Sequence, residues 1–178
     1  MKKVIFLDRD GVVNVDKGYV YKIEDFEFKD GIFEFLEEIE KMGYGCIIIT
    51  NQSGIGRGYY TLDQYYMLDG WMIEEFKKRG IMILKSYFCP HTPSDMCNCR
   101  KPKAGMIQRA TREHHIDLPH SMLLGDKLSD INAGINGDVG INILLKGKIG
   151  EDYTNSKADF IGEDFNQILE YIKQRSRG

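Results

Sequence analysis

The chain has 178 residues, a length that suits one domain with a sizeable core, so we expect a single domain over residues 1–178. Hydrophobic residues make up 42% and charged residues 29%, and no apolar stretch is long enough to span a membrane, so the composition excludes a transmembrane protein. The formal net charge of -3 provides no basic surface for nucleic acid. The N-terminus carries no apolar signal segment, which favours a cytoplasmic protein with reduced thiols.

Apolar runs alternate with amphipathic segments along the chain. The runs at residues 4–7, 46–49, 87–88, 122–124 and 141–145 are predicted to be buried strands. Helical periodicity covers residues 32–39 and 62–76, with Thr61 and Gln64 forming a capping box for the second helix. A closing helix is predicted over residues 165–171, followed by a frayed polar tail. This alternation predicts an α/β fold, a doubly wound parallel sheet with helices on both faces.

The first predicted strand runs directly into Asp8-Arg9-Asp10-Gly11. Residues two apart on an extended chain share a face, so we expect the carboxylates of Asp8 and Asp10 to converge while Arg9 points away. Gly11 lets the chain turn without a Cβ penalty. The carboxyl end of a strand is where open α/β sheets bind ligands, although two acids that merely end a strand would give the same pattern.

The second predicted strand ends in Thr50, Asn51, Gln52 and Ser53, and a glycine-rich loop over residues 54–58 follows. Hydroxyl and amide groups in this place are suited to holding phosphate oxygens. A dinucleotide site is disfavoured, because the spacing is G-x-G-x-G and no acid ends a following strand. A turn that binds no ligand is the other interpretation.

A third strand end carries Gly125-Asp126-Lys127, with Asp130 four residues beyond Asp126. If this strand neighbours the first, Asp126 completes an oxygen site for a hard cation, and Mg²⁺ is the ion that such a site fits best. Acids also favour the N-termini of helices, which is the simpler interpretation of Asp126 and Asp130 taken singly.

Four potential metal ligands lie close together in the sequence: Cys89, His91, Cys97 and Cys99. They suffice for a closed tetrahedral zinc site, which would be structural because protein fills every position. A disulfide is the rival interpretation, and a reducing compartment disfavours it. Arg100 and Lys101 follow at once, so a metal-clamped loop over about residues 89–102 could direct both cations into the site, unless they are simply a solvated basic pair.

Together these segments resemble the haloacid dehalogenase superfamily of phosphotransferases. The resemblance implies a Rossmann-like fold for this chain, without the large cap domain. Within this superfamily the segments are similar to heptose bisphosphate phosphatases and the related histidinol-phosphate phosphatases. The segments that carry the resemblance are residues 6–11, residues 50–54, the cysteine cluster with Arg100-Lys101-Pro102, and Gly125-Asp126-Lys127.

The resemblance implies a role for each residue. Asp8 is then the nucleophile and Asp10 the general acid and base, which must begin neutral. Magnesium is held by Asp8, the Asp10 main-chain carbonyl and Asp126. The residues implied to hold the transferring phosphoryl group are Thr50, Asn51 and Lys101. Those implied to face the sugar or its second phosphate are Asp16, Lys17, Gly18, Tyr19, Gln52, Ser53, Arg100 and Lys127, with Asn51 also lining the substrate site.

The function implied is Mg²⁺-dependent removal of one phosphate from a heptose bisphosphate, in nucleotide-activated heptose biosynthesis, with Zn²⁺ as a structural ion. We expect a small phosphorylated sugar as substrate, no nucleic acid or membrane partner, and a monomer. The alternatives are a histidinol-phosphate phosphatase and a non-enzymatic binding module stabilised by zinc.

Overall fold

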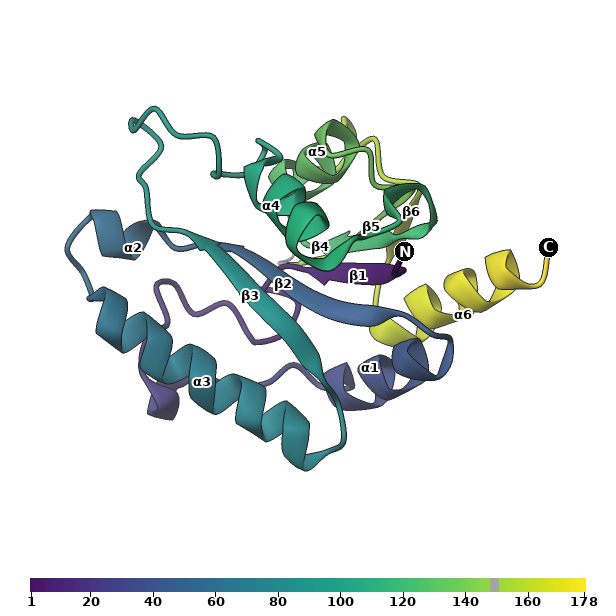
Figure 1. Ribbon diagram of the computed structural model, residues 1–178, viewed down its shortest axis with the longest axis horizontal. Helices are drawn as coiled ribbons and strands as arrows, with labels where there is room; N and C mark the ends of the chain where they lie inside the picture. Colours follow the sequence, from purple (N-terminus) through teal and green to yellow (C-terminus); the bar gives the residue numbers. More distant parts are fainter. Residues whose placement is uncertain (148–150) are drawn as a thin grey trace.

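The computed structural model describes residues 1–147 and 151–178 and contains one parallel sheet in the strand order β3-β2-β1-β4-β5-β6 (Figure 1). Every neighbouring pair is parallel, as the sequence predicts for a doubly wound fold. All of the predicted strands are confirmed. The strands are β1 (Val4–Leu7), β2 (Gly45–Asn51), β3 (Ile83–Cys89), β4 (Met122–Gly125), β5 (Ile141–Leu145) and β6 (Phe160–Gly162).

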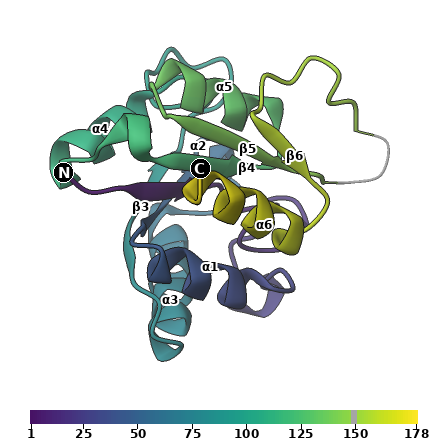
Figure 2. The same ribbon diagram turned by 90° about the vertical axis from the view of Figure 1, so that its right-hand side faces the viewer.

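Helices cover both faces of this sheet (Figure 2). On one face lie α1 (Ile32–Lys41), α3 (Leu62–Lys78) and α6 (Phe165–Ser176), and on the other lie α4 (Gly105–His114) and α5 (Leu128–Asn136). Alternate residues of β1 enter the two resulting hydrophobic cores: Ile5 and Leu7 pack in the first, and Val4 and Phe6 in the second. Burial on both faces explains why β1 reads as a continuous apolar run.

Local signals set the helix boundaries in part. The capping box of Thr61 and Gln64 at the start of α3 is confirmed, with reciprocal hydrogen bonds of 3.1 and 2.9 Å. Two expectations were wrong, and one strand was missed. The glycine-rich loop begins as a short helix, α2 (Ser53–Gly56); α6 continues to Ser176, beyond the expected end at residue 171; and β6 was not predicted. In the described part of the chain, no helix is long and apolar enough to cross a membrane.

Within residues 1–147 and 151–178, the connections at the carboxyl edge of the sheet are loops and short helices, and none of them forms a large cap domain. Residues 8–31 join β1 to α1 and include the 3-10 helix η1 (Ile23–Asp25). Residues 52–61 join β2 to α3, and residues 90–104 join β3 to α4. On the opposite side, η2 (Leu118–His120) precedes β4. The three long connections therefore surround the edge where β1, β2 and β4 end.

Candidate active site

The carboxyl ends of neighbouring strands bring the predicted acids together. In the sheet β1 lies between β2 and β4, and Leu7 pairs with Ile48 on one side and Leu124 on the other. The backbone N–H of Asp8 donates to the carbonyl of Leu124 over 3.1 Å, which extends the pairing past the end of β1. Asp8 and Asp126, each the first residue after its strand, therefore meet at one edge of the sheet.

Three buried carboxylates form a cluster at this edge. Asp8, Asp126 and Asp130 each present one oxygen, and these oxygens lie within 4.8 Å of one another. Among the described residues, Oδ1 of Asp126 has no hydrogen-bond partner although it is buried. Burial and then mutual repulsion raise the pKa of Asp8, and they raise the pKa of Asp126 to about 9. The donor set fits Mg²⁺, because a divalent cation would use the free oxygen and relieve the repulsion.

Gly11 is required by the close approach of its backbone to this cluster. Its φ of +98° lies in a region that L side chains rarely adopt, and a Cβ at this position would lie 2.1 Å from Oδ2 of Asp126. The turn after β1 therefore depends on glycine for two independent reasons. As a result, the chain can turn at residue 11 while Asp126 stays next to the end of β1.

Lys101 supplies the ammonium group that lies closest to this cluster in the described part of the chain, while the Nζ of Lys127 lies 3.6 Å from Oδ2 of Asp126. The Nζ of Lys101 lies 2.8 Å from Oδ1 of Asp8 and 2.7 Å from Oδ1 of Asp130, and it donates to the carbonyl of Ile49 over 2.9 Å. Burial opposes its charge, but the two carboxylates outweigh burial and raise the pKa of Lys101. The Asn51 amide holds the lysine backbone at both ends, accepting from its N–H at 3.0 Å and donating to its carbonyl at 3.2 Å.

Asp130 serves the helix and the site at once. Its Oδ2 accepts the backbone N–H groups of Asp126 and Lys127, each at 3.1 Å, as expected of an acid in the first turn of α5. Its other oxygen faces Lys101. In the sequence, Asp130 is interpreted as an acid at a helix N-terminus, which is confirmed, and it is not assigned to the site. Its spacing of four residues from Asp126, across a strand-to-helix turn, was the available signal.

The carboxylate of Asp10 is enclosed by hydrogen-bond donors. Arg9 donates through Nε to Oδ2 at 3.2 Å and through Nη2 to Oδ1 at 3.1 Å, while Asn14 donates to Oδ1 at 3.0 Å and Gln52 to Oδ2 at 3.2 Å. Burial favours protonation, but Arg9 and these hydrogen bonds outweigh burial and lower the pKa of Asp10. The expectation that Arg9 points away was wrong, because the chain turns directly after Asp8 and no longer alternates as a strand.

A buried polar network connects Asp10 with the end of β2. Nε2 of Gln52 donates to Oγ1 of Thr50 at 2.8 Å as well as to Asp10, and its Oε1 accepts from the hydroxyl of Tyr60. Burial raises the pKa of Tyr60 to about 12, so this hydroxyl remains a donor. The sequence did not single out Tyr60, and no signal near it in the chain indicated that it reaches the site. A Cβ on Gly54 would overlap its ring, so this glycine makes room for it.

Most of the clustered residues, but not Asp126, line a cavity of about 530 Å³. Lys17, Thr50 and Asp126 are predicted site residues that do not line it: Lys17 pairs with Glu27 at 3.2 Å, while Thr50 and Asp126 are buried. Lys127 Nζ lies 3.6 Å from Asp16 and 3.6 Å from Asp126. The lining residues are Asp8, Asp10, Asp16, Gly18, Tyr19, Asn51, Gln52, Ser53, Tyr60, Arg100, Lys101, Pro102, Lys127, Ser129 and Asp130.

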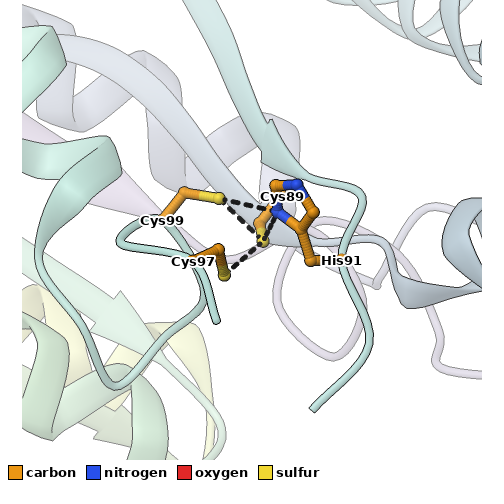
Figure 3. A group of neighbouring side chains, drawn as sticks. All are labelled: Cys89, His91, Cys97 and Cys99. Carbon is orange, nitrogen blue, oxygen red and sulfur yellow. Dashed lines mark hydrogen bonds between the residues drawn. The ribbon is translucent and has the colours of Figure 1, made fainter. Parts of the chain in front are cut away.

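Beside this cavity, the side chains of Cys89, His91, Cys97 and Cys99 point toward one another (Figure 3). Their ligand atoms lie within 4.8 Å, and Nδ1 of His91 is 3.4 Å from the sulfur of Cys89 and 3.2 Å from that of Cys99. Burial opposes ionisation of Cys97, but backbone N–H groups outweigh it and lower the pKa of this thiol to about 7. All four cysteines of the chain are free thiols. This donor set could hold zinc in a closed site.

The cysteine cluster and the cavity are joined by a short segment of chain. Cys89 ends β3, and Arg100 and Lys101 directly follow Cys99. Arg100 lines the cavity, and its Nη1 donates to the carbonyl of His91 at 3.4 Å. A metal in the cluster would therefore fix the backbone that carries two cations of the cavity.

Comparison with known proteins agrees with this geometry. Residues 98–168 match a family model described as HAD-hydrolase-like. The chain is 46% identical to the D-glycero-alpha-D-manno-heptose-1,7-bisphosphate 7-phosphatase of Campylobacter jejuni over 97% of both chains. It is 45% identical to the D-glycero-beta-D-manno-heptose-1,7-bisphosphate 7-phosphatase of Helicobacter pylori, over 96% of this chain and 98% of the relative.

A solved structure shares the fold over nearly the whole chain. The D,D-heptose 1,7-bisphosphate phosphatase from B. bronchiseptica, complexed with magnesium and phosphate, superimposes with a TM-score of 0.86 at 26% identity. The match covers 97% of this chain and 99% of that structure. Nearly the whole chain therefore has a counterpart in the fold of that structure.

Proposed function

Because this chain belongs to the heptose-1,7-bisphosphate 7-phosphatase family of haloacid dehalogenase-type hydrolases, we propose that it removes the 7-phosphate of D-glycero-D-manno-heptose 1,7-bisphosphate as a Mg²⁺-dependent phosphatase. One observation carries this proposal: Asp8, Asp126, Asp130 and Lys101 converge at the carboxyl edge of the sheet. This arrangement combines a nucleophile, acids for a cation and an ammonium group for phosphate. Residues 1–178 then form a single phosphatase domain.

In the first step, an oxygen of Asp8 attacks the phosphorus of the 7-phosphate. The bond from phosphorus to the sugar oxygen breaks, the sugar oxygen takes a proton from Asp10, and an aspartyl phosphate remains on Asp8. The donors around Asp10 favour its ionised form and lower its pKa, against the expectation that it begins neutral, so Asp10 has to take up this proton before the first step. Giving up the proton then returns Asp10 to the form that its surroundings favour. Lys101, which contacts Asp8, lies where it can stabilise the charge on the transferring phosphoryl group.

In the second step, water attacks the phosphorus of the aspartyl phosphate. Asp10 takes a proton from the water, the bond between phosphorus and Asp8 breaks, and inorganic phosphate leaves. Both steps thus use Asp10, once as an acid and once as a base. The ionised carboxylate that the surrounding hydrogen bonds favour is the form needed for this second step.

Asp8, Asp126 and the main-chain carbonyl of Asp10 would hold Mg²⁺, with Asp130 beside them. When bound, the ion offsets the repulsion between the attacking carboxylate and the anionic phosphate. A structural zinc would be held by Cys89, His91, Cys97 and Cys99. We propose that Arg100 and the loop over residues 16–19 contact the sugar or its 1-phosphate, because Arg100 and three residues of this loop, Asp16, Gly18 and Tyr19, line the cavity around Asp8.

The two relatives named above differ in the anomer that their names specify, α in one and β in the other, at almost equal identity to this chain. We therefore propose the heptose 1,7-bisphosphate as substrate and leave both anomers in the test. The protein is expected to act as a monomer in the cytoplasm on this small phosphorylated sugar, without a nucleic-acid or membrane partner.

The test is phosphate release by the purified protein from both anomers of the bisphosphate and from histidinol phosphate, with and without added Mg²⁺. The expected result is Mg²⁺-dependent release that is faster from at least one heptose anomer than from histidinol phosphate. Faster release from histidinol phosphate would move the chain to the alternative substrate. Release that is indifferent to Mg²⁺ would overturn the proposed use of the acid cluster.

A further inference from the structure

Arg9 separates the two aspartates of the first strand end and is almost fully buried, with 1% of its surface exposed. A guanidinium in such a place costs free energy unless ionised or carbonyl partners take its hydrogen bonds. The proposed reaction does not use the Arg9 side chain directly. Its partners therefore indicate what the protein gains from keeping a charge inside the domain.

These partners are the carboxylate of Asp10 and the backbone of the loop that lines the cavity. Nε and Nη2 of Arg9 each donate to a different oxygen of Asp10, at 3.2 and 3.1 Å. Nη2 also donates to the carbonyl of Val20 at 2.8 Å, directly after the loop over residues 16–19. The guanidinium group stands 6.0 Å from the ring centroid of Phe26. Arg9 thus binds both the Asp10 carboxylate and the backbone at Val20, directly after the loop.

Two parallel N–H donors on a planar group fix both the position and the plane of a carboxylate. Asn14 donates to Oδ1 of Asp10 and Gln52 donates to Oδ2, so these two also contact both oxygens, but from two separate side chains on different segments. Among the described residues, Arg9 is the one that engages both oxygens. Arg9 therefore fixes both oxygens of the Asp10 carboxylate, and hence its plane, from a single rigid group.

We propose that Arg9 is a positioning residue of the reaction, whose two-point contact holds the Asp10 carboxylate in the orientation from which it exchanges protons with the leaving group and with water. This inference rests on the proposed function, because it assigns Arg9 an action through Asp10. A purely structural role would also make Arg9 important for folding. It would not, however, make the effect of its loss depend on the leaving group.

Leaving groups provide the test, because a good leaving group needs little help from an acid and a poor one needs much. The assay measures kcat/KM for a series of substituted phenyl phosphates, which differ in leaving-group pKa and hardly in size. For these substrates kcat/KM reports the steps up to departure of the phenol, so it isolates the acid role of Asp10. The variants are Arg9→Lys, Asp10→Asn and, as the matched control, Arg79→Lys, a surface arginine paired with Glu37.

The expected result is a steeper dependence on leaving-group pKa in both Asp10→Asn and Arg9→Lys, and an unchanged slope in Arg79→Lys. Relative to the most activated substrate, Arg9→Lys should lose roughly tenfold in kcat/KM on phenyl phosphate, less than Asp10→Asn. In the double variant, Arg9→Lys should add nothing to the slope of Asp10→Asn, because it acts through that carboxylate.

Each failure has its own signature. If Asp10→Asn steepens the slope and Arg9→Lys lowers kcat/KM equally for every leaving group, the positioning role of Arg9 is wrong and the proposed reaction stands. If Asp10→Asn leaves the slope unchanged, Asp10 is not the acid and both proposals fall. The slope is a ratio between substrates, so it does not depend on the fraction of a variant that folds. Arg9→Gln, which keeps a donor and removes the charge, is the second variant if Arg9→Lys is insoluble.

Discussion

The substitution Asp126→Asn should make the Mg²⁺-free protein more stable while removing its activity. Asp126 shares a buried space with Asp8 and Asp130, and in the described structure the three acids face two ammonium groups, the buried one of Lys101 and the half-exposed one of Lys127. One oxygen of Asp126 has no hydrogen-bond partner there. Such a site is arranged for a cation and is unfavourable without one. Replacing one acid by its neutral amide relieves the repulsion and also removes a proposed ligand.

The size of the gain follows from the raised pKa of Asp126, which moves from 3.8 to about 9 on folding. A raised pKa means that the folded protein binds the proton more tightly than the unfolded chain does. The contribution of Asp126 to the free energy of unfolding is then greatest below about pH 4, and it is lost as the pH rises toward about 9. At pH 7 the loss is at most about 4 kcal/mol, since each unit between 3.8 and 7 costs about 1.4 kcal/mol. Asp126→Asn should recover roughly 1–4 kcal/mol of this.

Urea unfolding between about pH 5 and about pH 9, with and without Mg²⁺, measures this effect. Without the ion, the wild-type protein should lose stability with rising pH and Asp126→Asn should lose less. Added Mg²⁺ should stabilise the wild type by mass action and leave the variant nearly unchanged. The control is Asp30→Asn, which removes an exposed carboxylate. The reasoning would be refuted by an Asp126→Asn variant that is less stable than wild type without Mg²⁺ and is still stabilised by the ion.

Three further outcomes are expected. Asp8→Asn should abolish turnover with the fold intact, because an amide cannot attack phosphorus; clear residual activity in a folded variant by circular dichroism would remove Asp8 from this role. The purified protein should contain about one zinc per chain by elemental analysis, and stripping it should lower stability more than it alters kcat. Arg100→Ala should cost on the order of 1–3 kcal/mol in transition-state binding for the bisphosphate and little for p-nitrophenyl phosphate, whereas Lys101→Ala should lower kcat/KM for both substrates. Equal losses of kcat/KM on the two substrates in Arg100→Ala would place Arg100 among the catalytic residues.

The architecture could be predicted because strong local signals agreed with one another. Fully apolar runs mark strands that are buried on both faces, and Thr61 with Gln64 marks the start of α3. The strand β6, over Phe160–Gly162, was not predicted because it is short, is partly exposed and lies at the edge of the sheet. The end of α6 was placed too early because its last turn is polar and exposed, so no apolar periodicity marks it.

The site was predictable only where chemistry coincides with a strand end. Asp8 and Asp126 directly follow apolar runs, so topology alone brings them together. The position of Arg9 was not predictable, because alternation along a strand says nothing once the chain turns. The contact of Tyr60 with Gln52 depends on the path of the chain around α2, and the dual role of Asp130 depends on the angle at which α5 leaves β4. Both are tertiary features: nothing near Tyr60 in the sequence indicates its contact, and Asp130 is indicated only by its spacing of four residues from Asp126.

The most direct test of the proposed function follows both phosphates of the substrate by phosphorus NMR during turnover with Mg²⁺. We predict that the signal of the 7-phosphate of heptose 1,7-bisphosphate is replaced by that of inorganic phosphate while the 1-phosphate signal persists. Asp8→Asn should leave both signals unchanged. Release of the 1-phosphate, or no release from either anomer by folded and Mg²⁺-loaded protein, would contradict the account.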